Sequence, residues 1–269
     1  MDDEFLRTRN RPGNVSDRFP SVFRRSDPSN ILVARTPRGI ASALVFHDTR
    51  LDHGRLLRQI GLVSTRAEFR KQGFGSALLR FAHTCIAQDQ VSVALLWTSA
   101  YPFYQRLGWW RQDSSCVAKV EGSSVALAPT RGVIELEQIL RADEIRREWA
   151  PHLAPRSIEA WRTVPTHADE VDLIIENDGF ALVGKRNETG YLYEVVGPKY
   201  SWLALWRRIC ERHRRIVANG QLGSSWVRWM AKENNAAWAA NSLGMRFVPY
   251  EIVKPPIASL PHFSVIDRI

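Results

Sequence analysis

The sequence has few cysteines and no long hydrophobic run, and both absences narrow the class of protein. Its three cysteines, Cys85, Cys116 and Cys210, are odd in number and far apart, with no C-x-x-C pair. This argues against a disulfide framework and a thiolate metal site, and it fits a reducing compartment. No stretch approaches the roughly 18 consecutive apolar residues of a membrane span, and the polar N-terminus resembles no signal peptide. We therefore expect a cytoplasmic protein without a membrane partner.

The composition is that of an ordinary globular protein. Apolar residues make up 45% of the 269 residues and charged residues 24%. These values exclude disorder, collagen-like repeats and low complexity for the chain as a whole. At about 150 residues per domain, the length predicts two modest domains or one large one.

The positive charge is concentrated in the first half of the chain. Lys and Arg outnumber Asp and Glu by 37 to 28, which gives a net charge of +9. Residues 1–131 contain 19 basic and 11 acidic residues, whereas residues 132–269 contain 18 and 17. A basic surface attracts a polyanion, either a nucleic acid or a phosphorylated small molecule, although charge alone also serves solubility.

The first half alternates between strand and helix patterns. Residues 1–18 lack periodicity and predict a flexible arm. The β-rich runs and the apolar spacings that follow predict strands at Ile31–Arg35, Gly39–His47, Leu56–Thr65 and Val91–Trp97, a helix after residue 73, and a short helix at Tyr101–Leu107. Strands at Val117–Val120 and Val125–Leu127 are expected to close this domain as a hairpin, before a linker at Ala128–Gly132.

A similar order of elements is predicted for the second half. The patterns favour helices at Glu135–Trp149, Ser157–Trp161, Ser201–Val217 and Asn234–Leu243, and strands at Phe180–Arg186, Tyr191–Val196, Trp226–Met230 and Met245–Val253. Five arginines of the long helix, together with Glu211 and His213, could form a nucleic-acid stripe or a solvated helix face. Their position opposite an apolar stripe favours the solvated face; these are Arg207, Arg208, Arg212, Arg214 and Arg215.

A basic loop with two glycines connects the strand Leu56–Thr65 to the following helix. It reads Arg70-Lys71-Gln72-Gly73-Phe74-Gly75-Ser76. Unpaired backbone N–H groups at a helix N-terminus favour a bound anion, and glycine lets a phosphate approach the backbone closely. The loop alone fits either a phosphate site or a plain glycine-rich turn.

A second motif makes the pattern more specific. The segment Pro102-Phe103-Tyr104-Gln105-Arg106-Leu107-Gly108-Trp109 follows an apolar strand, and Tyr104 stands 29 residues after Gly75. Together the two motifs resemble motifs A and B of the Gcn5-related N-acetyltransferase (GNAT) superfamily, Arg/Gln-x-x-Gly-x-Gly/Ala and Phe-Tyr-x-x-x-Gly-Phe. The resemblance covers about residues 19–120.

The resemblance implies an acetyl-CoA site and the residues that form it. The strand end Val63, Ser64 and Thr65 would pair with the pantetheine arm, and the loop Arg70, Lys71, Gln72, Gly73, Phe74, Gly75 and Ser76 would bind the pyrophosphate. Ser99, after the next strand, is a further candidate contact. Tyr104 would offer its phenol to the sulfur of the departing coenzyme. No metal is implied.

The implied mechanism is direct attack of a neutral amine on the acetyl thioester within a ternary complex. Because a phenol has a higher pKa than a thiol, we expect Tyr104 to act as a hydrogen-bond donor. Its alternative role is that of a packed aromatic side chain. Cys85 lies on the apolar helix stripe, which argues against an acetyl-cysteine route. The base stays unassigned among four residues near an early turn: His47, Asp48, Asp52 and His53.

The end of the chain resembles the first half in a degenerate form. Glu233–Phe247 resembles a GNAT helix that runs into a Leu-Gly-x-Phe strand, but Ala240 stands where the first copy has Tyr104. The loop Gly197-Pro198-Lys199-Tyr200-Ser201 lacks the phosphate motif. A second acetyl-CoA site is therefore not expected, and the second unit is either a wall of the acceptor cleft or a stabilising or dimerising platform.

The sequence thus predicts an α/β protein of two GNAT-like units, each a mixed central sheet flanked by helices. The domains are expected at residues 19–130 and 131–269, after the arm. The expected function is acetyl-CoA-dependent acetylation of a small amine or an exposed amino group, by a monomer or homodimer. The alternatives are a non-catalytic acetyl-CoA-binding or scaffold protein and, less in keeping with the motifs, a nucleic-acid-binding module.

Overall fold

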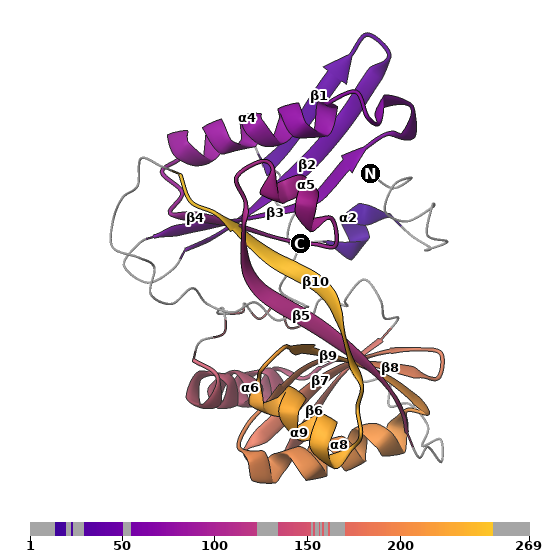
Figure 1. Ribbon diagram of the computed structural model, residues 1–269. Helices are drawn as coiled ribbons and strands as arrows, with labels where there is room; N and C mark the ends of the chain where they lie inside the picture. Colours follow the sequence, from indigo (N-terminus) through magenta and orange to yellow (C-terminus); the bar gives the residue numbers. More distant parts are fainter. Residues whose placement is uncertain are drawn as a thin grey trace. The chain divides into compact units, whose positions relative to one another are not determined.

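The computed structural model describes residues 14–19, 23, 30–50, 55–122, 134–151, 153, 156, 158, 161 and 170–249. These residues form two compact units, each a mixed β-sheet flanked by helices, as the sequence predicted (Figure 1). Described residues up to Asp113 and from Ser242 onward belong to unit 1. Those from Ser114 to Asn241 belong to unit 2.

Unit 1 is a sheet with the strand order β1-β2-β3-β4-β10. All neighbouring strands pair antiparallel except β3 and β4, which are parallel and are connected through helix α4. The elements are α2 (Val15–Arg18), β1 (Ile31–Thr36), β2 (Gly39–Arg50), β3 (Leu56–Thr65), the 3-10 helix η4 (Ala67–Phe69), α4 (Phe74–Gln88), β4 (Val93–Thr98), α5 (Tyr101–Gln105) and β10 (Trp238–Phe247).

Helices cover both faces of the unit 1 sheet. Leu78, Leu79, Ala82 and Ile86 of α4 are buried at the spacing of one helix face, as predicted, although Phe81 is 57% exposed. On the other face, Val15 of α2 is 2% exposed and packs with Val45 and Leu62. The end of the predicted flexible arm is therefore a packed helix.

Unit 2 repeats the strand pattern of unit 1, with the order β6-β7-β8-β9-β5. The pair β8 and β9 is parallel, and the other pairs are antiparallel. The elements are β5 (Trp110–Glu121), α6 (Leu136–Trp149), β6 (Glu170–Glu176), β7 (Gly179–Arg186), β8 (Thr189–Val196), α8 (Lys199–Arg212), β9 (Arg215–Gln221) and α9 (Ser225–Glu233). Asn177 and Asn187 take positive φ angles of 54° in the two hairpin turns, a conformation that asparagine tolerates.

The fifth strand of each unit follows the elements of the other unit in the sequence. A simple repeat would pair β5 with β4 and β10 with β9. Instead, β5 pairs with β9 over Ser115–Glu121, and β10 pairs with β4 over Leu243–Phe247. The strand predicted at Val117–Val120 therefore does not close the first half as a local hairpin, and the last strand completes unit 1.

Three elements of the second half differ from their predictions. Trp226–Met230 lies in helix α9, because Ser224 caps the helix and Trp226, Val227 and Met230 share its buried face. Of the segment predicted as a helix at Asn234–Leu243, the residues from Trp238 onward belong to β10, whose end Leu243–Phe247 pairs with β4. Helix α8 ends at Arg212, and Ile216 and Val217 belong to β9.

The arginines of α8 form ion pairs on an exposed helix face. Arg208 is half exposed and binds Glu176 of β6 at 2.8 Å, and Arg212 binds Asp172 of the same strand. Neutralised in this way, the two arginines fit a solvated face better than a nucleic-acid stripe. None of the described helices is long and apolar enough to cross a membrane. Strand Val125–Leu127 and linker Ala128–Gly132 lie outside the described residues.

His83 of α4 packs against β10, and its protonation should lower the stability of the protein at acidic pH. Its ring stacks on Phe247 with centroids 3.8 Å apart, and its Nε2 accepts a hydrogen bond from Trp109 Nε1 at 3.0 Å. Burial, together with the nearby charge of Arg80, lowers the pKa of His83 to about 4. The pKa of His83 in the unfolded chain is about 6.5. Between this pH and about pH 4, His83 is protonated in the unfolded chain and neutral in the folded chain. The free energy of unfolding should therefore fall by about 2 kcal/mol from pH 7 to pH 5 through this residue.

The variant His83→Gln tests this assignment, because glutamine can accept the Trp109 hydrogen bond but does not titrate. Urea unfolding at pH 7 and pH 5 should show that the variant loses less stability on acidification than the wild-type protein. The difference should be about 2 kcal/mol. Equal losses in both proteins would contradict a buried neutral His83.

Candidate functional site

Strands β3 and β4 separate at the middle of unit 1. Their parallel pairing runs from Leu57 and Val93 to Gln59 and Leu95, where it ends, although β3 continues to Thr65 and β4 to Thr98. Within the described residues, the edge of β3 that faces β4 therefore makes no strand pairing with β4 beyond Gln59. The opposite edge stays paired with β2, with an irregularity near Leu62, whose φ is 51°. An open strand edge of this kind offers N–H and C=O groups to an extended ligand.

Ser42 holds the free end of β3 in place. This β2 residue is 2% exposed, and its hydroxyl donates a hydrogen bond to the Ser64 carbonyl at 2.6 Å. The same hydroxyl lies 3.1 Å from Thr65 Oγ1. The predicted contact residues Val63, Ser64 and Thr65 therefore lie on the separated part of β3, and two of them are fixed from β2.

The predicted phosphate loop joins η4 to α4 and is shaped by its own hydrogen bonds. Arg70 Nε donates to the Thr65 carbonyl at 3.2 Å, and Gln72 Nε2 donates to the Glu68 carbonyl at 2.8 Å. Lys71 and Gly73 have positive φ angles of 62° and 85°. Gly73 is the N-cap of α4, where no side chain caps the helix. The N–H groups of the first turn, at Phe74, Gly75 and Ser76, are therefore available to an anion.

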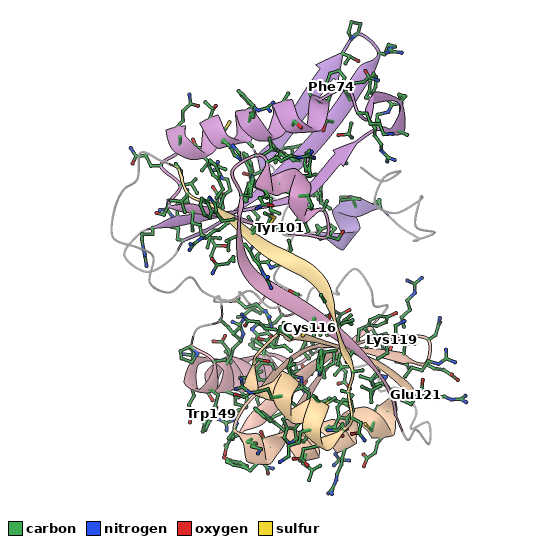
Figure 2. The ribbon with its side chains drawn as sticks, viewed as in Figure 1. Phe74, Tyr101, Cys116, Lys119, Glu121 and Trp149 are labelled. Atoms are coloured by element: carbon green, nitrogen blue, oxygen red, sulfur yellow. The ribbon has the colours of Figure 1, made fainter. Side chains whose placement is uncertain are left out.

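Gly75 marks the place where three segments meet. A Cβ at this position would lie 3.1 Å from Thr65 Oγ1 and 4.0 Å from the Phe103 ring. The end of β3, at Thr65, and helix α5, at Phe103, thus both lie next to the first turn of α4 at Gly75. Figure 2 marks Phe74, where α4 begins, and Tyr101, where α5 begins. Glycine is the residue that keeps this junction open to a ligand.

Tyr104 lies on α5 beside this junction. It is 8% exposed, and its ring makes edge contacts with Phe103 and Trp109 at centroid distances of 5.0 and 6.3 Å. Its hydroxyl has no hydrogen-bond partner among the described residues. Burial raises the pKa of Tyr104 to about 12, so the phenol stays protonated at neutral pH. Tyr104 is therefore a donor without an acceptor in the described part of the chain.

The remaining predicted residues differ in how the structure uses them. Ser99 is exposed in the turn after β4, and no contact joins it to the loop. Asp48 is bound by Arg58 through two hydrogen bonds of 2.7 Å, so it is poorly placed to act as a base. His47 is paired with Gln59 in the sheet register. Asp52 and His53 lie outside the described residues. The base therefore stays unassigned.

Sequence reasoning missed three residues of this region. Ser42 and Phe103 touch the junction, and Gln59 is the last residue of β3 that pairs with β4. The Gln59 side chain is 2% exposed, and among the residues that the structure describes its Oε1 has no hydrogen-bond partner. A buried amide oxygen without a donor is the kind of group that an N–H of a ligand would satisfy. No local pattern marks Ser42 and Gln59, because strand pairing brings Ser42 to β3 and leaves Gln59 at the separation, whereas Phe103 stands in the motif around Tyr104.

Unit 2 has the same strand separation but no open loop beside it. The pairing of β8 with β9 ends at Leu192 and Ala218. In the loop that follows β8, a Cβ on Gly197 would lie 2.6 Å from the Gly179 backbone, so the loop packs directly on the β6–β7 turn. The carboxylate of Asp178 in that turn already accepts the Tyr200 hydroxyl at 2.7 Å.

A buried ion cluster occupies the separated part of β8. Glu194 accepts hydrogen bonds from Arg146 at 2.9 Å and from Arg156 at 2.8 Å, and all three side chains are almost fully buried. Despite burial, the two guanidinium groups lower the pKa of Glu194. The charged groups at this part of β8 are thus paired with one another inside the protein. Within the described parts of both units, no group of three His, Cys, Asp or Glu side chains could hold a metal ion.

Comparison with known proteins finds a family model that matches much of the first unit. Residues 8–111 match the model of the acetyltransferase (GNAT) domain. No curated protein matches the chain at a significant level. Among solved structures, a GCN5-related N-acetyltransferase from Kribbella flavida is similar with a TM-score of 0.60 and 16% identity, over 81% of this chain and 60% of that one.

Two further structures resemble the chain in fold. A GCN5-related N-acetyltransferase from Anabaena variabilis has a TM-score of 0.61 and 15% identity, over 82% of this chain and 63% of that one. A tandem GNAT protein from the clavulanic acid biosynthesis pathway has a TM-score of 0.54 and 12% identity, over 88% of both chains. This chain therefore spans less than two thirds of the Kribbella and Anabaena proteins. Its residues 8–111 match the GNAT acetyltransferase domain model, and its two-unit fold resembles that of a tandem GNAT protein.

Proposed function

We propose that the protein is an acetyl-CoA-dependent N-acetyltransferase that acetylates a primary amine by direct attack in a ternary complex. The observation that carries the proposal is the convergence at Gly75 of an open strand edge, an uncapped helix N-terminus and the helix of Tyr104. In acetyl-CoA, the extended arm would pair with the strand edge, the phosphates would bind at the helix N-terminus, and the thioester sulfur would lie near Tyr104. Membership of residues 8–111 in the GNAT domain family supports the same activity.

The residues of unit 1 fit acetyl-CoA in a defined order. The β4-facing backbone of Val63, Ser64 and Thr65 would hold the amide-containing pantetheine arm. The loop from Arg70 to Ser76 would bind the pyrophosphate through backbone N–H groups and positive charge. Ser99 is a further candidate contact on the adjacent turn. The surplus of basic residues in the first half of the chain is suited to the same anionic ligand.

Tyr104 is assigned to the leaving group. Acetyl-CoA would supply an activated thioester whose carbonyl carbon a neutral amine attacks; the C–N bond forms, the C–S bond breaks with CoA thiolate as the leaving group, and the proton lost by the amine passes to the unassigned base or to water. The Tyr104 phenol, protonated and without a partner among the described residues, would donate a hydrogen bond to the negative charge that develops on sulfur. Full proton transfer from a group with a pKa of about 12 would be strongly uphill, so stabilisation by a hydrogen bond is its role.

An acetylation assay tests the proposal. The purified protein is incubated with acetyl-CoA and a panel of small amines and peptides with free amino groups, and release of CoA thiol is measured against reactions without amine. Amine-dependent thiol release supports the transferase. If acetyl-CoA binds but neither small amines nor peptides increase thiol release, the chain is a non-catalytic acetyl-CoA-binding protein and the proposed activity is wrong.

A further inference from the structure

Two arginines from different segments share one aromatic ring beside the phosphate loop. The Phe69 ring is 2% exposed, and the guanidinium carbons of Arg38 and Arg66 lie 5.2 and 5.9 Å from its centroid. The same ring makes an edge contact with Phe74, the first residue of α4, at 5.7 Å. The arginine pair is thus tied through Phe69 to the helix end where the pyrophosphate is proposed to bind.

The backbone holds both arginines at this position. Arg38 lies in the β1–β2 turn, just before Gly39, whose φ is 110°. Arg66 follows β3, and its backbone N–H donates to the Ala41 carbonyl at 3.0 Å. A Cβ at Gly39 would lie 3.6 Å from Arg66 Nη1, so the turn and the Arg66 side chain are neighbours. The hairpin turn and the end of β3 thus place both guanidinium groups against the Phe69 ring.

The charges around Phe69 are not balanced within the protein. Arg66 binds Glu68 at 2.6 Å, but the Arg38 guanidinium has no carboxylate partner among the described residues. Lys71 adds another positive charge in the loop, with no ion pair to any described carboxylate. Two positive charges held at the same Phe69 ring repel each other, and a bound anion would offset this repulsion. The planar forks of two guanidinium groups match a phosphate dianion better than lysine ammonium groups do.

We propose that Arg38 and Arg66 bind the 3′-phosphate of the coenzyme, so that the protein selects CoA over its 3′-dephospho form. This inference rests on the proposed function, because it assumes that acetyl-CoA binds at the loop. The 3′-phosphate is on the ribose, a few bonds from the pyrophosphate, and it needs a second anion site close to the first. The Phe69–Phe74 contact places the arginine pair within that reach of α4.

The test compares two ligands that differ only in this phosphate. Dissociation constants of CoA and 3′-dephospho-CoA are measured by titration calorimetry for the wild-type protein and for Arg38→Gln. Wild-type protein should bind CoA about 10-fold more tightly, and Arg38→Gln should lose about 10-fold in CoA affinity while its affinity for 3′-dephospho-CoA stays unchanged. The control Arg55→Gln removes an exposed positive charge at the opposite end of β3 and should leave both affinities unchanged.

The outcomes separate this inference from the proposed function. If Arg38→Gln weakens both ligands equally, or if the wild-type protein does not discriminate between them, the 3′-phosphate assignment is wrong although the coenzyme site stands. If the wild-type protein binds neither ligand, the proposed function and this inference both fail. Arg38 is exposed in a turn, and circular dichroism melting of the variant verifies that it is folded.

Discussion

The variant Gly75→Glu is expected to reduce acetyl-CoA affinity by at least about 100-fold, because it places both a side chain and a negative charge at the proposed pyrophosphate position. The Cβ alone would lie 3.1 Å from Thr65 Oγ1. The carboxylate would occupy the N–H groups at the start of α4 and repel the phosphates. Titration calorimetry with acetyl-CoA measures the effect.

Thr84→Glu is the matched control for that variant. Thr84 is an exposed residue of the same helix, beyond its second turn, so this substitution adds the same charge away from the loop. Its affinity for acetyl-CoA should stay close to that of the wild-type protein. If Gly75→Glu binds acetyl-CoA as well as Thr84→Glu does, the loop is only a glycine-rich turn and the coenzyme lies elsewhere.

The variant Tyr104→Phe is expected to lower kcat about 100-fold and to leave acetyl-CoA affinity unchanged. A hydrogen bond to a charged group contributes about 1.5–3 kcal/mol, and here the charge develops only as the thiolate leaves. The phenylalanine ring can keep the edge contacts with Phe103 and Trp109. The measurement is kcat with the amine identified by the acetylation assay, together with the dissociation constant of acetyl-CoA.

The control Tyr101→Phe removes a hydroxyl from the same helix, three residues earlier, and should leave kcat unchanged. Because the folded pKa of Tyr104 is raised to about 12, its phenol donates at every pH below that value. The pH profile of kcat between 6 and 10 should therefore keep its shape in Tyr104→Phe while its height falls. Unchanged turnover in Tyr104→Phe would assign Tyr104 to packing alone.

Local features of the first half were predictable because they are encoded in short segments. The apolar spacing of α4, the glycines at positions 73 and 75 and the Phe103-Tyr104 pair each act within a few residues. The α/β class of both units followed from the alternation of strand and helix patterns. The contact between Gly75 and Thr65 agrees with a strand end and a loop that serve one ligand.

The exchanged strands could not be predicted from local patterns. The first part of β10 contains Ala239, Ala240 and Asn241 and has little strand propensity, whereas its end, Leu243–Phe247, pairs with β4, far away in the sequence. Trp226–Met230 have residues typical of strands, yet they lie in helix α9, whose N-terminus is capped by Ser224. In both cases a tertiary contact or a single cap outweighs the average preference of the segment.

The same distinction applies to the site. Tyr104 and the loop were found from motifs, whereas Ser42, Gln59 and the Arg38–Arg66 pair required the fold. Ser42 binds the carbonyl of Ser64 on the neighbouring strand, and Arg38 contacts the Phe69 ring from a hairpin turn. These residues have no distinctive neighbours in the sequence, so only strand register brings them to the coenzyme region.

The central claim is that unit 1 holds one acetyl-CoA and that unit 2 holds none. The most direct measurement is the stoichiometry of acetyl-CoA binding to the purified chain by titration calorimetry. The open strand edge and loop of unit 1, and the packed Gly197 loop with the buried Glu194 cluster of unit 2, predict one site per chain. Two sites per chain, or no binding, would contradict the account.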